Sequence, residues 1–519
     1  MQDAAALEQL MREAGAALEA GEFGRAELLF REIVGRNPRD AGAWNVLAVI
    51  ACRSARPQEA VEHARRAHEL ERRNPEYLNT LGVAHAEAQS LDEAVRAFRR
   101  ALRGRADYAD AHYNLGKVLR KLERLSEAEQ AYRRARQLAP ARTDIANNLG
   151  CLLYRMGRSA EALPLLEEVA AALPQDDDVA VSSALAIRAA EGAEAACARL
   201  EAFVARNPGA ANARKELARS LLALGRFEEG WREYSWRTER APEVLPNNLA
   251  GKKLLLLPHE GLGDHLFFLR FAPGLRARGA TVAFRCSRKL FGVLNGNPAL
   301  DAVLAEDSIA RSGFVPDLAI GIGDLPWLLG SFGTPPPLAL RVPEQNLARW
   351  REKLPALGPP PYIGATWRGG TKRLADIEFA PQAIEPLFKE IDAGALGGLL
   401  GRMRGTLLVL QRLPARAELD AFSRAAGRPA HDLSALNESL EDMAAVLALI
   451  DDYVGVSNTN MHLRAGLGKA ARVLVPFPPE FRWMARGTES PWFPGFRIYR
   501  QEPAMRWKQA LDELGRDLS

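Results

Sequence analysis

Residues 254–271 read LLLLPHEGLGDHLFFLRF. The four leucines predict a strand buried on both faces, Gly261 and Gly263 predict a tight turn, and Asp264 is placed to cap the helix that comes next. In an open α/β sheet, such a unit puts loop amides and a helix N-terminus at the carboxyl edge of the strands, where ligands bind. We therefore expect a ligand site here; the alternative is that the glycines serve packing alone.

The chain before this unit repeats itself every 34 residues. Small residues recur in one register at Ala14, Ala48, Gly82, Gly116, Gly150, Ala184 and Ala218, and in a second at Ala26, Ala60, Ala94, Ala128, Ala162, Ala196 and Gly230. Two locked registers resemble the tetratricopeptide repeat, a pair of helices with small residues where the helices approach closely. We expect an all-α superhelix of about seven such repeats over residues 1–240, with its aromatic last unit, residues 225–237, docking onto the next part of the chain.

A repeat array of this kind usually binds a protein or an extended peptide in its concave groove. Asn79, Asn114 and Asn148 lie on the predicted first helices of three repeats, near the small positions. Their side-chain amides are suited to hold a peptide backbone; the alternative is that they are ordinary exposed helix residues. We take them as the candidate acceptor groove.

After Gly251 the pattern changes to alternating strands and helices. The first predicted half, residues 241–340, contains strands at 254–257, 281–286 and 318–322. A proline-rich passage leads to the second half, residues 341–519, with strands at 362–367, 407–411 and 453–457, the last of which runs into a polar helix start. Two such halves with a cleft between them suit a nucleotide-sugar, because amides and helix N-termini neutralise a diphosphate without a metal.

Several short segments resemble one family of enzymes. They are EGLGD at 260–264, WRGG at 367–370, Gln411, SNT at 457–459 with HLRAG at 462–466, and FRW at 481–483 with SPWFP at 490–494. Together they resemble bacterial tetratricopeptide-repeat glycosyltransferases, which are similar to the ADP-heptose:lipopolysaccharide heptosyltransferases and, more distantly, to protein O-GlcNAc transferases. The resemblance spans essentially the whole chain and implies two Rossmann-like halves of GT-B type, an inverting transfer and no metal.

The resemblance also implies roles for single residues. Asp264 matches the acidic residue proposed as the base, Lys372 matches the basic residue that holds the donor phosphates, and Thr459 and His462 match the donor-loop pair. The family usually carries Asp at the position where Asn458 stands in this chain.

The chemistry of inverting transfer agrees in outline, because it needs a base for the acceptor proton and positive or amide groups for the departing diphosphate. The candidate catalytic residues are therefore Asp264 and Lys372. The candidate donor-binding residues are Gly263, Arg368, Gln411, Asn458, Thr459, Asn460, Met461 and His462. Alternatives stay open: Asp264 as a helix cap only, Lys372 as a solvated loop charge, His462 as a residue of its own strand–helix junction, and His265 as a rival base.

The overall composition excludes some other functions. Lys and Arg number 69 against 65 Asp and Glu, a formal net charge of +4, and they are scattered over helical faces, so we expect no nucleic-acid partner. Four widely spaced cysteines fit a reducing compartment. The chain shows no signal-peptide core and no run near the ~18 apolar residues of a membrane span, so we expect a cytoplasmic protein without a transmembrane segment.

The sequence thus predicts an inverting, metal-independent glycosyltransferase that needs no cofactor and moves a sugar from a nucleotide-sugar to a protein or peptide held by the repeats. One alternative is a catalytically impaired scaffold for protein–protein interaction, for which Asn458 is the hint. The other is a transferase that acts on lipopolysaccharide or other glycan acceptors.

Overall fold

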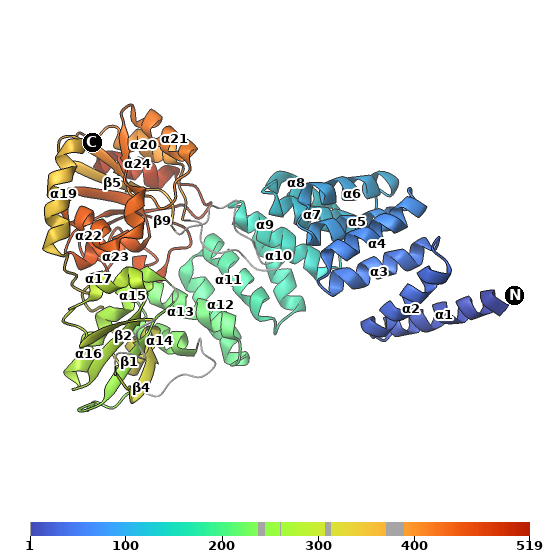
Figure 1. The fold of residues 1–519 in the computed structure, drawn as a ribbon, viewed down its shortest axis with the longest axis horizontal. Helices are drawn as coiled ribbons and strands as arrows, with labels where there is room; N and C mark the ends of the chain where they lie inside the picture. Colours follow the sequence, from blue (N-terminus) through green and yellow to red (C-terminus); the bar gives the residue numbers. More distant parts are fainter. Residues whose placement is uncertain (1, 237–243, 260, 307–312, 370–388, 519) are drawn as a thin grey trace. The chain divides into compact units, whose positions relative to one another are not determined.

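The computed structural model describes residues 2–236, 244–259, 261–306, 313–369 and 389–518. In this part of the chain, residues 2–156 and 164–172 form one compact unit, and residues 157–163 together with the chain from residue 173 onward form a second. The first unit is entirely helical, and the second contains helices and two parallel sheets (Figure 1).

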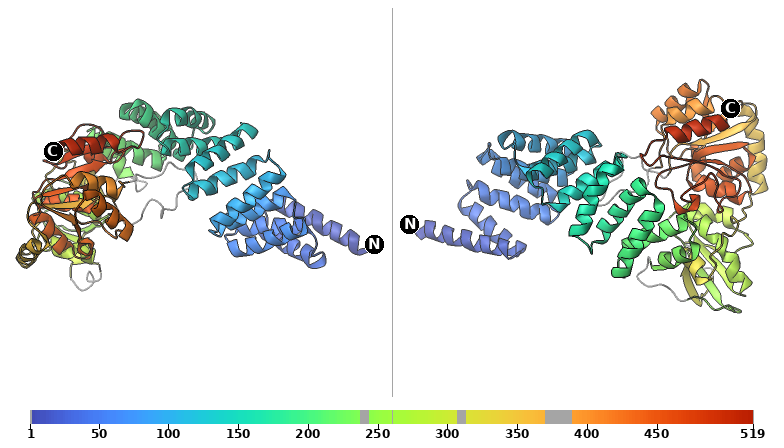
Figure 2. Two further views of the ribbon diagram at one scale, coloured as in Figure 1. Left: turned by 90° about the horizontal axis from the view of Figure 1, so that it is seen from above. Right: turned by 180° about the vertical axis from the view of Figure 1, so that it is seen from behind.

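The first unit is built from successive helix pairs. Its helices are α1 (Gln2–Glu19), α2 (Phe23–Arg36), α3 (Ala41–Arg53), α4 (Pro57–Leu70), α5 (Pro75–Glu87), α6 (Leu91–Gly104), α7 (Ala109–Lys121), α8 (Leu125–Leu138), α9 (Thr143–Arg155) and most of α10 (Ser159–Ala172). Capping residues and prolines mark where several of these helices begin. Asp40 caps α3 by accepting the Ala43 amide at 2.9 Å, and Pro57 and Pro75 occupy the first turns of α4 and α5. The two views of Figure 2 show these helices lying side by side along the unit.

The small residues lie where two helices of a pair touch. Gly82 on α5 faces the ring of Phe98 on α6, and a Cβ at Gly82 would lie 2.5 Å from that ring. Gly116 on α7 faces Tyr132 on α8, where the corresponding distance is 2.7 Å. The 34-residue register therefore has a steric cause, since a larger residue at these positions would push the paired helices apart.

The second unit begins with four more helices of the same kind. They are α11 (Asp177–Glu191), α12 (Ala193–Arg206), α13 (Ala211–Ala223) and α14 (Phe227–Ser235). Trp231 of α14 is fully buried and packs edge-on against Phe268 at 6.1 Å, Phe481 at 5.6 Å and Trp492 at 6.1 Å between ring centroids. The predicted docking of the last aromatic repeat onto the next part of the chain is therefore observed.

The first sheet has four parallel strands in the order β3-β2-β1-β4. The strands are β1 (Lys253–Leu257), β2 (Thr281–Cys286), β3 (Ala302–Ala305) and β4 (Leu318–Gly321), and the helices that follow them are α15 (Leu262–Phe268), α16 (Ala272–Ala277), α17 (Arg288–Leu294) and α18 (Leu325–Leu328). Leu254 and Leu256 face one hydrophobic cluster and Leu255 faces another, so β1 is buried on both sides as its four leucines predict.

The second sheet has six parallel strands in the order β10-β9-β8-β5-β6-β7. The strands are β5 (Tyr362–Thr366), β6 (Thr406–Val409), β7 (Ala430–Asp432), β8 (Asp452–Val456), β9 (Arg472–Val475) and β10 (Arg497–Arg500). Its helices are α19 (Glu344–Leu357), α20 (Ala393–Leu400), α21 (Arg416–Ala426), α22 (Leu440–Leu449), α23 (Thr459–Gly466) and α24 (Lys508–Asp517). The predicted helical array followed by a region of parallel strands is thus confirmed.

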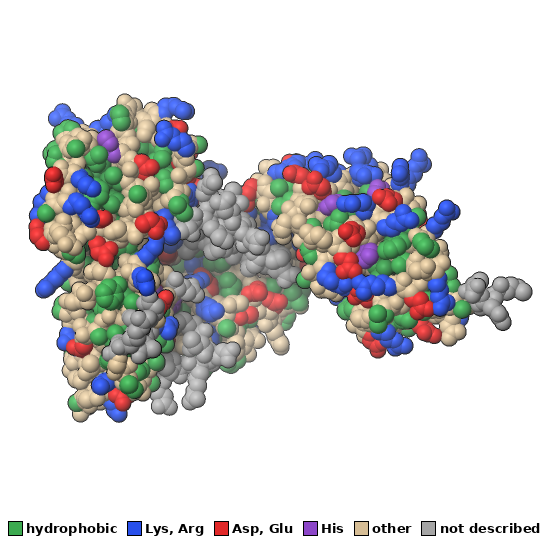
Figure 3. All heavy atoms as spheres, in the orientation of Figure 1, with side chains coloured by type: hydrophobic (Ala, Val, Ile, Leu, Met, Phe, Trp, Pro, Cys, Tyr) green, Lys and Arg blue, Asp and Glu red, His purple; other side chains and the backbone are tan. Residues whose placement is uncertain are grey.

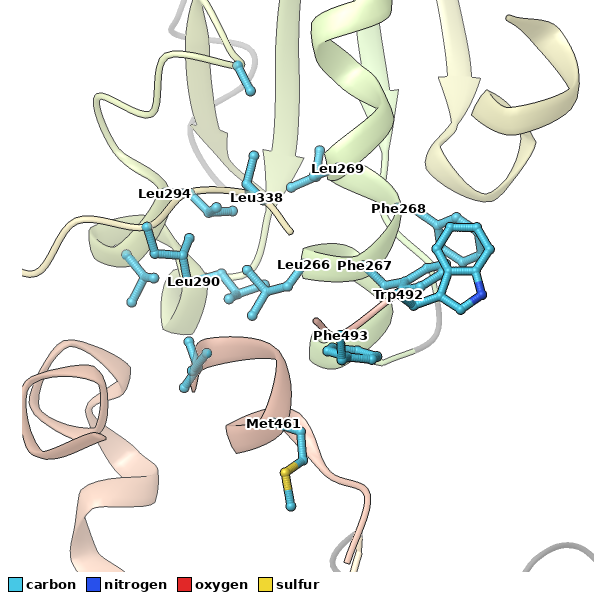
Figure 4. Packing of buried hydrophobic residues seen from close by; sticks show 14 of the residues in the cluster. Leu266, Phe267, Phe268, Leu269, Leu290, Leu294, Leu338, Met461, Trp492 and Phe493 are labelled. Carbon is cyan, nitrogen blue, oxygen red and sulfur yellow. The ribbon is translucent and has the colours of Figure 1, made fainter. Parts of the chain in front are cut away.

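One continuous hydrophobic core joins the two sheets. It contains Leu266 and Phe267 of α15, Met461 of α23, and Trp492 and Phe493 of the C-terminal segment, as Figure 4 shows. Because the same core supports α15 and α23, the starts of these two helices are held close together, and this is where the polar residues gather.

Candidate functional site

A polar cavity of about 240 Å³ lies between loops of the two sheets. Its walls come from the carboxyl ends of β1 and of β5 to β9 and the segments that follow them, which is where parallel sheets bind ligands. The predicted site residues that line it are Gly263, Asp264, Arg368, Asn458, Thr459, Asn460 and His462. The cleft expected between Asp264 and Thr459 is therefore present.

The start of α15 differs from the prediction. The helix begins at Leu262 after Gly261 in an extended conformation, so Asp264 lies inside the first turn and does not cap it. The predicted cap is wrong, and neither glycine has a positive φ, so the backbone conformation itself does not require glycine at these positions. Gly263 instead faces His462 of α23, where a Cβ would lie 3.0 Å from the imidazole Cδ2. The glycine allows the two helix starts to approach.

Asp264 is placed between two neighbours. Its Oδ1 forms an ion pair with the guanidinium of Arg482, which belongs to the short helix η7 (Phe481–Trp483), and its Oδ2 lies 4.0 Å from His259 Nδ1. The rings of Phe267 and Phe481 lie 4.8 and 5.1 Å from the Arg482 guanidinium carbon. Asp264 is therefore a partly buried carboxylate with one oxygen fixed by a cation.

Behind this pair lies a second charged group, Glu480. Its Oε2 accepts a hydrogen bond from Ser457 Oγ at 2.6 Å, and its Oε1 pairs with the Lys389 ammonium and lies 4.0 Å from Arg482 Nη1. Burial acts to raise the pKa of Glu480, but the charges of Lys389 and Arg482 and the hydrogen bonds from Lys389 and Ser457 lower it to about 2. The site thus contains two carboxylates and two cations in alternation.

His462 contributes a neutral imidazole. Burial lowers the pKa of His462 well below its ordinary value, and the guanidiniums of Arg482 and Arg270 act in the same direction. His265, the rival base, is buried outside the cavity lining with its Nε2 2.7 Å from the His259 carbonyl oxygen, and burial lowers its pKa. Of the three groups, Asp264 and His462 line the cavity, and Asp264 is the one held in an ion pair.

Asn458 caps α23. Its Oδ1 accepts the Asn460 amide at 3.0 Å, and its Nδ2 donates to Thr366 Oγ1 at 2.9 Å. Both the oxygen and the nitrogen of the side-chain amide form hydrogen bonds. Because the amide is neutral, Asn458 adds no charge to the start of α23. The positive end of the helix dipole therefore faces the cavity uncompensated by this residue.

Two of the predicted donor-binding residues lie outside the cavity lining. Gln411 is buried and its Oε1 accepts the amides of Trp367 and Arg368, at 3.0 and 2.9 Å, so it shapes the loop after β5. Met461 packs its side chain into the hydrophobic core, and its amide donates to the Asn458 carbonyl (Figure 4). Arg368 lines the cavity, but its guanidinium pairs with Glu418 at 2.6 Å.

Lys372 lies outside the described residues. Lys389, Ser457, Glu480 and Arg482 line the cavity, but no role was predicted for them. Arg482 stands in the FRW segment that carries the family resemblance, and this was its only signal. Lys389 reaches the site through backbone pairing, with the Gly369 amide donating to its carbonyl at 2.8 Å, which no local sequence pattern announces.

The asparagines of the first unit are joined to neighbouring side chains. Asn114 Nδ2 donates to Asn79 Oδ1 at 3.2 Å, and Asn148 Nδ2 donates to Tyr113 Oη at 3.1 Å. Asn148 is buried and the other two are half-buried, so their interpretation as ordinary exposed residues is wrong. On the face shown in Figure 3, basic and acidic side chains lie interspersed over this unit.

The chain contains tetratricopeptide repeats in its N-terminal region, followed by a C-terminal region of parallel-strand sheets. Residues 11–77 and 79–143 match one model of the tetratricopeptide repeat, and residues 142–172 match another. Within the described helices, none is long and apolar enough to cross a membrane. Among the same residues, no group of three His, Cys, Asp or Glu side chains is arranged to hold a metal ion.

The chain is also similar to individual proteins. Protein FlbA of Caulobacter vibrioides is 27% identical over an alignment of 372 residues, which covers 62% of this chain and 58% of the length of FlbA. Among solved structures, pilF of Pseudomonas aeruginosa is 20% identical, with 40% of this chain and 95% of that chain covered and a TM-score of 0.36. TTC0263, a TPR protein of Thermus thermophilus, is 23% identical, with 35% and 98% covered and a TM-score of 0.31.

Proposed function

We propose that this chain is an inverting, metal-independent glycosyltransferase of GT-B type that moves a sugar from a nucleotide-sugar to a protein or peptide held by the repeats. The observation that carries the proposal is the cavity at the carboxyl ends of both sheets, with Asp264 on one wall and the start of α23 on the other. The resemblance of the motifs around it to bacterial tetratricopeptide-repeat glycosyltransferases supports the same assignment.

In this proposal Asp264 is the base. Its Oδ2 takes the proton of the acceptor hydroxyl, the acceptor oxygen forms a bond to the anomeric carbon, and the bond from that carbon to the diphosphate oxygen breaks. The nucleoside diphosphate leaves with the electron pair of the broken bond. The dipole of α23 and the charges of Arg482 and Lys389 stabilise the negative charge that develops on it.

The size of the cavity fits part of the donor. Pockets for drug-sized ligands enclose roughly 300–1,000 Å³, and the cavity here encloses about 240 Å³. We assign this space to the diphosphate and the sugar, and the nucleoside to the open edge of the cleft. Arg482 lines the same space while its guanidinium pairs with Oδ1 of Asp264, so it is placed to contact the incoming diphosphate without leaving Asp264.

The test is the Asp264→Asn variant, measured against a panel of nucleotide-sugars by thermal shift and by donor hydrolysis or transfer. The substitution removes the basic oxygen and releases Arg482, so turnover falls by roughly 10² to 10⁴ while donor affinity does not fall. Asp317→Asn is the control, because Asp317 binds the Lys253 amide at the amino end of β1, away from the cavity. Wild-type turnover in Asp264→Asn would remove Asp264 from the mechanism.

A second candidate is a scaffold that has lost catalysis. The pairing of Asp264 with Arg482 and the presence of Asn458 in place of Asp favour it, since both reduce the negative charge of the site. In that case no nucleotide-sugar of the panel raises the melting temperature of the wild-type protein, because only a ligand that binds the native state stabilises it.

The acceptor is assigned to the repeats of the first unit. The linked amides of Asn79 and Asn114 stand on consecutive first helices and offer a ladder of polar groups to an extended peptide backbone. This assignment favours a polypeptide over a lipopolysaccharide, because a lipid acceptor gains nothing from such a ladder.

A further inference from the structure

The last helix of the repeat array reaches the candidate base through one histidine. Tyr234 of α14 places its hydroxyl 3.1 Å from His259 Nε2, and the two rings are stacked with centroids 6.4 Å apart and planes at 20°. His259 lies in the loop between β1 and α15, and its other ring nitrogen, Nδ1, lies 4.0 Å from Asp264 Oδ2. The imidazole of His259 therefore lies between the hydroxyl of Tyr234 and the carboxylate of Asp264.

The two oxygens of Asp264 have different surroundings. Oδ1 is paired with Arg482, so Oδ2 is the oxygen left to take a proton, and it is the one that faces His259. The side chains of His259 and Asp264 are only 19% and 23% exposed. A dipole or charge on the imidazole therefore acts on Oδ2 with little screening by water.

The position of Tyr234 is fixed by packing. Its ring contacts Trp231 of the same helix at 5.5 Å, Phe268 at 5.9 Å and Phe481 at 6.5 Å between centroids. Phe268 and Phe481 belong to helices that follow strands of different sheets. The position of the hydroxyl is therefore fixed by the packing of the ring as well as by its hydrogen bond.

We propose that Tyr234 and His259 are positioning residues for Asp264, so that the last repeat helix is part of the candidate active site. The inference rests on the proposed role of Asp264 as base. The hydroxyl of Tyr234 sets which nitrogen of His259 carries the proton, and that choice sets whether a proton or a lone pair faces Asp264 Oδ2. The last repeat helix, which belongs to the same compact unit as both sheets, is thereby connected to the group that takes the acceptor proton.

Several groups of the described structure face His259. They are the Tyr234 hydroxyl from α14, the Asp264 carboxylate from α15 with Arg482 behind it, and the imidazole of His265 at the His259 carbonyl. Asp264 favours the protonated imidazole, and Arg482 opposes it by neutralising Asp264. The pKa of His259, measured by titration, therefore depends on the neighbouring groups of Tyr234, Asp264 and Arg482.

The first test does not depend on activity. Histidine side chains are titrated by NMR in the full chain, which contains eight, and the signal of His259 is assigned as the one missing from His259→Gln. Asp264→Asn lowers the measured pKa of His259 by about one unit, because an attractive charge is lost and Arg482 is freed. Tyr234→Phe changes the tautomer seen in the ¹⁵N shifts. A His259 titration unchanged in both variants would overturn the proposal.

The second test uses the transfer reaction. Tyr234→Phe lowers kcat about tenfold and moves the pH profile of kcat, with the KM for the donor unchanged, and His259→Gln has the same effect. Tyr362→Phe is the matched control, since it loses one hydroxyl hydrogen bond, to Gly358 O at 3.1 Å, away from the cavity. An unmoved pH profile in Tyr234→Phe contradicts the inference. Absence of transfer in the wild type contradicts the proposed function instead, and the NMR test still decides the inference.

Discussion

Glu480 offers a direct measurement of the charge network beneath the cavity. Its side chain is 14% exposed, its Oε2 accepts a hydrogen bond from Ser457, and its Oε1 pairs with Lys389 beside Arg482. The variant Glu480→Gln keeps the shape of the side chain and removes its charge. In this variant Lys389 loses its ion pair with residue 480, and an N–H of the new side-chain amide faces a cation.

The expected cost follows from the titration of the group. A pKa lowered from 4.5 to about 2 means that the folded state favours the carboxylate by about 3 kcal/mol, at about 1.4 kcal/mol for each pH unit. This agrees with the roughly 3–5 kcal/mol that follows removal of one partner from a buried ion pair. We therefore expect Glu480→Gln to lower the free energy of unfolding by about 3 kcal/mol at pH 7.

The pH dependence has a definite sign. The folded-state pKa of Glu480 lies below the unfolded value, so its contribution is fully present above pH 4.5 and is lost as the pH falls toward 2. The difference in unfolding free energy between wild type and Glu480→Gln therefore shrinks with acidification.

Urea denaturation at pH 7 and at several values between 4.5 and 3 measures both effects. The matched control is Glu438→Gln, because Glu438 pairs with Lys289 at 2.7 Å but its side chain is 68% exposed. We expect the control to lose much less stability than Glu480→Gln, because water screens an exposed ion pair. The reasoning fails if Glu480→Gln costs no more than Glu438→Gln, or if its cost stays constant as the pH falls.

Three further substitutions test the repeat register and the cap of α23. Gly82→Ala should destabilise the first unit by about 1–3 kcal/mol in thermal unfolding followed by circular dichroism, because the new Cβ meets the buried ring of Phe98. Gly15→Ala, with no atom within 4 Å, should stabilise it by up to about 1 kcal/mol. Asn458→Asp keeps the cap and should change stability by less than about 1 kcal/mol, but its charge should weaken pyrophosphate binding several-fold in calorimetry. Tighter binding would show that the cavity does not take anions.

Much of the fold was predictable because its causes are local. The two small-residue registers reflect contacts within a helix pair, such as Gly116 against Tyr132, so the sequence shows them at fixed spacing. The strand β2 was predicted with its observed bounds, since Val282, Ala283 and Phe284 give it a central apolar run. Strands β3, β7, β9 and β10 were missed, because three or four residues give little room for a clear period, although β4 and β6, also of four residues, were predicted.

The site was predictable only in part. The loops after β1 and β8 carry glycine and polar residues directly after apolar strands, and the structure brings both to one cavity. Arg482 and Glu480, by contrast, reach Asp264 and Lys389 across more than 90 positions of sequence. Ion pairs between such distant residues depend on how the two sheets pack together, and a periodic pattern in the sequence does not predict that packing.

Gly263 shows why the right site followed from a partly wrong argument. The sequence suggested a glycine that lets the backbone turn, but its φ is not positive. Its missing Cβ instead gives room to His462, whose imidazole would lie 3.0 Å away, so the first turns of α15 and α23 meet. Those turns carry Asp264 and Thr459. The glycine therefore marks the site because it brings the two sheets together at the cavity, and the chemistry follows from that contact.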